Sequence, residues 1–290
     1  MPDLENISRS WERTPLSRAL ASAVAALAAA GVASPRVDAE LLAAHVLGIP
    51  RGRLLLVDSL RPEELSRFTA LVAERAKRIP LQHLLGTAAF RHLELQVGDG
   101  VFVPRPETEL LAGWGIEHTR PGATVVDLCS GSGAIALAVA DEAEPGRVVA
   151  VERSPAALAW LRRNAETYPA VEVLPGDVTD PDLLAGLRGQ VDVLLCNPPY
   201  VPDGTAVPPE VAEHDPAEAV FGGPDGLAVV RPVIALAAAL LRTGGVVGIE
   251  HDDVHGGSVP ELLRADGRFT AVTAHDDLAG RPRYATARRT

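Results

Sequence analysis

A strongly apolar run that begins at Val191 ends in Asn197, Pro198, Pro199 and Tyr200. At the end of a buried strand, an Asn side chain and a Pro carbonyl can accept both N–H bonds of an NH2 group. An amide nitrogen is a poor nucleophile because its lone pair is delocalised, and two acceptors would orient that lone pair and stabilise the developing positive charge. The proline pair pre-positions these groups, and the Tyr ring offers a flat face for a planar group. The motif predicts nitrogen methylation, with Asn197, Pro198 and Tyr200 as catalytic residues and Pro199 in the same substrate site.

A second motif, Asp127-Leu128-Cys129-Ser130-Gly131-Ser132-Gly133, follows another apolar run and precedes a helical pattern. Its glycines allow close backbone approach to a ligand, and a helix N-terminus directs N–H groups there. The G-x-G-x-x-G pattern of dinucleotide sites is absent, and an Asp followed by G-x-G better suits S-adenosylmethionine, a cation without phosphate. A tight turn without a ligand is the alternative. The predicted cofactor contacts in this loop are Asp127, Cys129, Ser130, Gly131 and Gly133.

Acidic residues end the next two predicted strands. Glu152 can accept hydrogen bonds from both ribose hydroxyls, and Asp177 can receive an adenine amino group. Either one alone would be read as an ordinary surface carboxylate. Ligands of open α/β sheets bind at the carboxyl ends of the strands, so we predict that Glu152, Asp177 and Asn197 join the cofactor site.

Composition limits the classes of function. The chain has 290 residues, 47% of them hydrophobic, which suits one large domain or about two of ordinary size. No apolar run reaches the roughly 18 residues of a membrane span, and the Ala-rich stretch 19–30 lacks the apolar core of a signal peptide. Cys129 and Cys196 suggest no disulfide framework, which fits a reducing cytoplasm. The net charge of −11 makes a polyanion an unfavourable primary substrate.

The first part of the chain has helical patterns, over 15–30, 35–47 and 61–78. They predict a small bundle, assigned to residues 1–85. Alternation over 90–97, a turn at 98–100 and a return over 101–103 predict a β-hairpin, and 86–104 are assigned as a linker containing it.

The remainder, 105–290, alternates predicted strands and helices. The predicted strands cover 124–129, 147–151, 171–174, 191–196 and 246–250, with 268–272 and 283–287 as a closing hairpin. The predicted helices cover 134–141, 155–167, 181–187 and 227–241. Continuous apolar strands separated by helices indicate an α/β fold with a doubly wound parallel sheet.

Further segments strengthen the interpretation as a methyltransferase. These are Pro80-Leu81-Gln82-His83-Leu84-Leu85-Gly86, Val103-Pro104-Arg105-Pro106-Glu107-Thr108-Glu109, Gly131-Ser132-Gly133-Ala134-Ile135-Ala136-Leu137 and Gly222-Gly223-Pro224-Asp225-Gly226-Leu227. With Asn-Pro-Pro-Tyr they resemble the signature of the HemK (PrmC) family, from about Pro80 to the C-terminus. The resemblance implies a seven-stranded, Rossmann-like class I methyltransferase domain behind an N-terminal domain that docks the substrate.

The resemblance also implies a reaction. HemK-type enzymes transfer a methyl group from S-adenosylmethionine to the side-chain amide of the glutamine in the Gly-Gly-Gln motif of class I peptide chain release factors, and S-adenosylhomocysteine is the product. It implies that Arg105 and Glu107 shape the wall of the substrate pocket. The alternative for both residues is charge at a helix N-terminus.

The chain departs from the family pattern in two places. Cys129-Ser130 replaces the usual Gly-Thr, so we expect cofactor binding to survive with Cys129 crowding the methionine moiety. After Glu250-His251 the family's usual Gly and later Gln are missing. The side chains there that could be mistaken for metal ligands are His251, Asp252, Asp253 and His255. We expect that segment to be a solvated loop and predict no metal site.

Three other functions share some of these features. An N6-adenine DNA methyltransferase shares Asn-Pro-Pro-Tyr but would need a basic groove. A ribosomal-protein glutamine methyltransferase shares the catalytic motif, and the segment from Arg105 to Glu109 favours the release-factor branch. A non-enzymatic module could bind the cofactor or a partner alone. We expect a protein substrate, a cytoplasmic location, and neither a membrane nor a direct nucleic-acid substrate.

Overall fold

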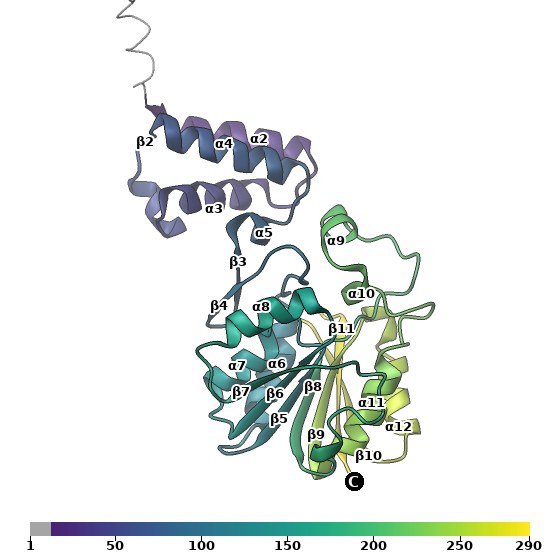
Figure 1. Ribbon diagram of the computed structural model, residues 1–290. Coiled ribbons are helices and arrows are strands. Elements are labelled where there is room, and N and C mark those ends of the chain that lie inside the picture. Colours follow the sequence, from purple (N-terminus) through teal and green to yellow (C-terminus); the bar gives the residue numbers. More distant parts are fainter. Residues whose placement is uncertain (1–12) are drawn as a thin grey trace, which may run out of the picture. The chain divides into compact units, whose positions relative to one another are not determined.

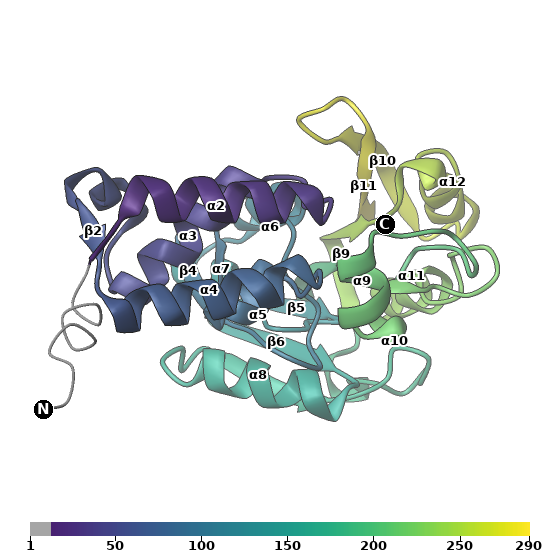
Figure 2. The same cartoon turned by 90° about the horizontal axis from the view of Figure 1, so that it is seen from above.

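The computed structural model describes residues 13–290 and divides the chain into two compact units, one ending at Gly86 and one covering Thr87–Thr290. The first unit is a helical bundle (Figure 1). Its elements are β1 (Thr14–Pro15), α2 (Leu16–Ala29), α3 (Pro35–Leu47), the 3-10 helix η2 (Arg51–Leu56), β2 (Ser59–Leu60), α4 (Pro62–Ala76) and α5 (Leu81–Leu85). Helices α2 and α4 lie side by side (Figure 2).

Local sequence explains where these helices begin and end. Pro35 occupies the first turn of α3, where a missing N–H costs nothing, and Gly48 ends the helix with a φ of 65°. Glu64 accepts the Arg61 backbone N–H at 2.7 Å as part of a capping box that starts α4. The helices pack around an apolar core that includes the fully buried Leu27 and Leu42.

The hairpin is real but was predicted in the wrong place. It consists of β3 (Thr87–Phe90) and β4 (Leu93–Gln96), joined by a two-residue turn in which Arg91 has a φ of 51°. The alternation that predicted one strand over 90–97 continues through the turn because Phe90 and Leu93 are paired across the strands. The apolar residues after it are buried in non-strand conformation, so they gave a false strand signal; Val97, Val101 and Val103 are at most 1% exposed.

The second unit contains a seven-stranded sheet with the order β10-β11-β9-β8-β5-β6-β7. The strands are β5 (Thr124–Leu128), β6 (Arg147–Glu152), β7 (Val171–Pro175), β8 (Val191–Cys196), β9 (Leu241–Glu250), β10 (Phe269–Asp276) and β11 (Pro282–Arg289). Strands β5 to β9 pair in parallel, whereas β11 runs antiparallel to both β9 and β10. The predicted α/β fold with seven strands, a hairpin and an N-terminal helical domain is confirmed.

Helices cover both faces of this sheet (Figure 1). On one face lie α6 (Thr108–His118), α7 (Ala134–Glu142) and α8 (Pro155–Ala165); on the other lie α11 (Val230–Leu240) and α12 (Ser258–Ala265). Two short helices, α9 (Pro209–His214) and α10 (Ala217–Val220), follow β8. Successive residues of a strand point alternately into the apolar cores on the two faces of the sheet, as Leu194 and Leu195 do. Both faces are buried, which explains why the strands are continuous apolar runs in the sequence.

One predicted helix was wrong. Within 181–187 only a short 3-10 helix, η3 (Ala185–Leu187), is formed. Asp180 accepts the N–H of Asp182 at 2.9 Å in a local turn, and Leu184 adopts a positive φ of 55°. Both features compete with a helical start. Within residues 13–290, no helix is long and apolar enough to cross a membrane.

Candidate active site

A cavity of about 280 Å³ lies beside the carboxyl ends of β5, β6, β7 and β8. Among the residues predicted for the site, those that line it are Arg105, Cys129, Ser130, Gly131, Glu152, Asp177, Asn197, Pro198, Pro199 and Tyr200. Three predicted residues, Asp127, Gly133 and Glu107, are not in its lining. The sheet therefore brings most of the predicted cofactor and substrate residues to one place, as the strand-end argument requires.

The loop after β5 is shaped by unusual backbone conformations. Cys129, Gly131 and Gly133 have positive φ values of 59°, 56° and 92°. A Cβ at Gly133 would lie 2.6 Å from Leu161 Cδ1, so this position requires glycine for packing as well as for backbone conformation. Gly133 thus allows α7 to begin beneath the cavity without contributing to its lining.

Asp127 acts from below the loop. Its side chain is 1% exposed, and its Oδ2 accepts the N–H of Ala136 at 3.2 Å. Burial raises the pKa of Asp127 to about 7, against the lowering effect of hydrogen bonds from Ser130 and Ala136. Asp127 therefore ties the loop to α7, and the expected direct contact with the cofactor does not follow from this geometry.

Glu152 and Asp177 do face the cavity. Glu152 accepts the N–H of Gly131 at 2.9 Å through Oε2, and those of Arg153 and Ser154 at 2.7 Å through Oε1. This ties the loop after β5 to the end of β6. The Thr179 backbone N–H and hydroxyl, with Arg153, hold the pKa of Asp177 below its usual range, although burial opposes them.

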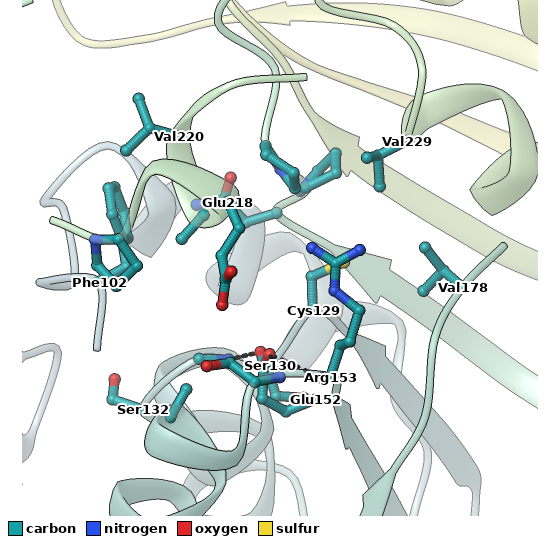
Figure 3. A pocket seen from close by; sticks show the side chains of 18 of the residues that line it. Phe102, Cys129, Ser130, Ser132, Glu152, Arg153, Val178, Glu218, Val220 and Val229 are labelled. Carbon is teal, nitrogen blue, oxygen red and sulfur yellow. Dashed lines mark hydrogen bonds between the residues drawn. The ribbon is translucent and has the colours of Figure 1, made fainter. Parts of the chain in front are cut away.

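The chemistry of this lining fits S-adenosylmethionine. Two carboxylates can accept from ribose hydroxyls and an adenine amino group, and apolar side chains such as Val178 and Phe102 line the same cavity. Figure 3 shows Glu218, from α10, pointing into the cavity beside the loop that carries Ser130. Glu218, Phe102 and Val178 were missed from sequence because none belongs to a strand-end motif with an acidic or glycine signature.

The Asn-Pro-Pro-Tyr motif forms another part of the same cavity wall. Asn197 Nδ2 donates to Thr108 Oγ1 at 3.1 Å, and the Tyr200 hydroxyl donates to Glu250 Oε1 at 3.1 Å. Burial, together with the nearby Glu250, raises the pKa of Tyr200. The phenol therefore remains a neutral hydrogen-bond donor, with its ring in the cavity lining.

Arg105 and Glu107 have different surroundings. Arg105 lines the cavity, pairs with the buried Asp215 at 2.5 Å and lies over the Phe102 ring, 4.7 Å from its centroid. Glu107 instead precedes α6, and its nearest cation is Arg281 at 3.9 Å. The expectation of a pocket wall thus fits Arg105, whereas Glu107 occupies the helix-terminal position of the alternative interpretation.

The segment after β9 is only in part the solvated loop that we expected, because Val254 is 67% exposed whereas the two histidines are buried. His251 is fully buried and His255 is 6% exposed, and His251 Nδ1 lies 2.8 Å from the Asp252 carbonyl. Burial lowers the pKa of His251. Across the part of the chain that the structure describes, no three His, Cys, Asp or Glu side chains form a group that could hold a metal ion.

Comparison with known proteins identifies relatives of both units. The PrmC N-terminal domain family matches residues 18–86, and the methyltransferase small domain family matches 108–214. In fold, the chain is similar to a 16S rRNA N2 methyltransferase of T. thermophilus solved with AdoMet and guanosine, with a TM-score of 0.51 and 24% identity over 70% of this chain and 50% of that one. That likeness supports the methyltransferase fold of the sheet.

Sequence relatives extend over nearly the whole chain. It is 58% identical to the release factor glutamine methyltransferase of Mycolicibacterium smegmatis, over 95% of this chain and 98% of that protein. The proteins of the same name from Streptomyces coelicolor and Mycobacterium tuberculosis are 49% and 47% identical, over 93% and 94% of this chain and 96% and 91% of theirs. The resemblance seen in the sequence is confirmed: the chain belongs to the release factor glutamine methyltransferase family.

Proposed function

We propose that this protein transfers a methyl group from S-adenosylmethionine to the side-chain amide nitrogen of the glutamine in the Gly-Gly-Gln motif of class I peptide chain release factors. The observation that carries the proposal is the placement of Asn197, Pro198 and Tyr200 in one cavity with Glu152 and Asp177. An acceptor for NH2 hydrogens thereby shares a cavity with carboxylates suited to a nucleoside.

The roles of the residues follow from this placement. S-adenosylmethionine supplies a methyl group on a sulfonium, and S-adenosylhomocysteine is left as a neutral thioether. Asn197 Oδ1 and the Pro198 carbonyl accept the two N–H bonds of the glutamine amide, and Tyr200 stacks on its plane. As the amide nitrogen forms its bond to carbon, these oxygens stabilise the positive charge on nitrogen, and the excess proton then passes to water. Positioning and electrostatics supply the catalysis, without a covalent enzyme intermediate.

Glu152 and Asp177 hold the ribose and the adenine in this proposal, and the loop from Cys129 to Gly131 contacts the methionine part. Glu152 retains acceptor capacity because a carboxylate has about four lone-pair sites and three are used by backbone N–H groups. The unit ending at Gly86 docks the release factor. The reaction takes place in the cytoplasm, where the two cysteines, free in the structure, remain reduced.

Methyl transfer from labelled S-adenosylmethionine to three separate acceptors tests the proposal. The acceptors are a class I release factor, a mixture of ribosomal proteins and duplex DNA. We expect label in the release factor only. Faster transfer to a ribosomal protein or to DNA would favour one of the related enzymes, and cofactor binding without transfer to any acceptor would indicate a binding module.

A further inference from the structure

Two buried polar side chains lie behind the Asn-Pro-Pro-Tyr motif without lining the cavity. Thr108 is 4% exposed and is the first residue of α6, and Glu250 is 1% exposed and is the last residue of β9. Neither of them is part of the cavity lining, where the reacting groups would bind. Any effect they have on the reaction must therefore pass through Asn197 or Tyr200.

Two hydrogen bonds join these four side chains in pairs, and the Thr108 hydroxyl lies near enough to Glu250 to lower its pKa; we call the four the acceptor network. Asn197 Nδ2 donates to Thr108 Oγ1 at 3.1 Å, and the Tyr200 hydroxyl donates to Glu250 Oε1 at 3.1 Å. The hydroxyls of Thr108 and Tyr200 both lower the pKa of Glu250 by hydrogen bonding, against the larger raising effect of burial. The network thus joins the ends of β8 and β9 to the start of α6.

This arrangement determines which end of the Asn197 amide faces the substrate. A Thr hydroxyl has one proton to donate. When Glu250 accepts that proton, Thr108 Oγ1 can only accept from Asn197, so Nδ2 is held at Thr108 and Oδ1 is left for the substrate. In the flipped amide, Asn197 would present an N–H donor to the N–H donors of the glutamine. Two donors facing each other would repel and would leave the substrate nitrogen without its acceptor.

Glu250 is expensive to bury. Within residues 13–290 it forms no ion pair, and its Oε2 is buried without a hydrogen-bond partner, although Arg283 is near enough to affect its charge. A carboxyl in such surroundings destabilises a fold relative to an apolar side chain of similar size. Core packing therefore does not explain why a carboxyl is buried at Glu250, whereas a role at the neighbouring Asn-Pro-Pro-Tyr motif does.

We propose that Thr108 and Glu250 are positioning residues that orient the Asn197 amide, with Thr108 holding Nδ2 and Glu250 fixing the direction of the Thr108 hydroxyl. The inference rests on the proposed function, because Oδ1 matters only if the acceptor carries NH2 hydrogens. It extends the acceptor site from the Asn-Pro-Pro-Tyr motif to two residues 89 and 53 positions away from Asn197 in the sequence.

The test compares Thr108→Val with Thr108→Ser in the full chain, with a release factor as substrate. Thr108→Val keeps the shape of the side chain but removes the hydroxyl, and we expect kcat to fall about 10- to 100-fold. Thr108→Ser keeps the hydroxyl and should stay within about threefold of the wild type. The affinity for S-adenosylmethionine, measured by calorimetry, should be unchanged in both variants.

A matched control lies at the other end of the same helix. Thr119 is also buried, and its hydroxyl donates to the Gly115 carbonyl at 2.8 Å. Thr119→Val therefore removes a buried hydroxyl bond remote from Asn197, and we expect it to leave kcat within about twofold. An equal loss of kcat in Thr119→Val and Thr108→Val would mean that helix stability, and not amide orientation, is responsible.

A double-mutant cycle with Asn197→Ala separates positioning from a general effect. If Thr108 acts through Asn197, Thr108→Val should reduce kcat no further once Asn197 is Ala. Glu250→Gln, which retains an acceptor oxygen, should keep most of the activity that Glu250→Leu loses. Additive losses, or full activity of Thr108→Val, would overturn the inference while the wild-type activity still supports the proposed function. If the wild type transfers no methyl group to the release factor, the proposed function fails, and the inference fails with it.

Discussion

The Tyr200 hydroxyl donates a 3.1 Å hydrogen bond to Glu250 Oε1, linking the loop after β8 to the last residue of β9. Glu250 is 1% exposed, so the bond is shielded from water. Hydrogen bonds of this kind contribute more than exposed ones because neither partner can be satisfied by solvent. The Tyr200 ring is thus held by its polar end while its face remains in the cavity lining.

Tyr200→Phe should separate the effect of the hydroxyl bond to Glu250 from the effect of the aromatic ring. Phe keeps the aromatic face but loses the bond to Glu250, and we expect kcat to fall roughly 5- to 30-fold, as for the loss of about 1–2 kcal/mol. Tyr200→Ala loses the ring as well and should be slower still. Steady-state kinetics with a release factor give both values, and a Phe variant as active as the wild type would show that the bond does not matter.

Stability should depend on pH through Glu250. Burial raises the pKa of this carboxyl from 4.5 to about 7, so the folded state binds its proton more tightly than the unfolded state. The contribution of Glu250 to stability is therefore full below about pH 4.5 and is lost as the pH rises through about 7. Between pH 5 and pH 8 the free energy of unfolding of the wild type should fall by about 2–3 kcal/mol relative to that of Glu250→Gln.

Urea unfolding of the two proteins at several pH values measures this difference. Other titrating groups are common to both proteins and cancel in the comparison. A difference that is constant with pH would show that Glu250 has an ordinary pKa in the folded protein, and one that grows in favour of the wild type would show that folding lowers this pKa.

The helical unit contains one buried ion pair whose loss should be severe. Arg75 Nε lies 2.8 Å from Asp38 Oδ2, and the two side chains are only 8% and 10% exposed. Asp38→Ala leaves the guanidinium buried without its carboxylate and should cost about 3–5 kcal/mol. Hydrogen exchange of the amides in α3 and α4 reports the free energy of opening for this unit.

An exposed ion pair provides the comparison. Arg36 pairs with Glu40 at 2.9 Å, but its side chain is 83% exposed. Arg36→Ala should change the free energy of opening, measured by the same exchange experiment, by less than about 1 kcal/mol. Similar effects for the two variants would mean that Asp38 and Arg75 are not buried as the structure has them.

Gly222 supports the acceptor motif by close packing. A Cβ at this position would lie 2.5 Å from the carbonyl oxygens of both Pro199 and Gly226, so Gly222→Ala must displace the Asn-Pro-Pro-Tyr turn. Since small misplacements at a reacting centre cost about 100-fold in rate, we expect a loss of kcat of that order with little change in cofactor affinity. Gly186→Ala serves as the control, because its Cβ would meet nothing within 4 Å, and it should leave kcat unchanged.

The features that were predicted best from the sequence are those that depend on a local pattern of residues. The apolar run 191–196 matches β8 to the residue, and the motifs at strand ends meet in one cavity because parallel strands end at the same edge. The predicted position of the hairpin was wrong because cross-strand pairing extends an alternating pattern through a two-residue turn. The 181–187 helix was wrong because local turn hydrogen bonds prevail over weak helical periodicity.

Contacts between distant residues could not be predicted. Thr108 and Asn197 meet only after α6 has packed against β8 and β9, and Glu218 reaches the cavity from a short helix without any sequence signature. The cofactor contact of Asp127 stays a prediction: its strand-end position suits that role, but the direction of the carboxylate depends on the conformation of the loop. In the structure the carboxylate bonds to Ala136 beneath that loop.

Tandem mass spectrometry of a class I release factor incubated with this protein and S-adenosylmethionine tests the central claim most directly. The account predicts one added methyl group, located by fragmentation on the glutamine of the Gly-Gly-Gln peptide, and its absence when Asn197→Ala replaces the wild type. A methyl group on any other residue of the release factor, or an unmodified glutamine after incubation with cofactor-bound wild-type protein, would contradict the account.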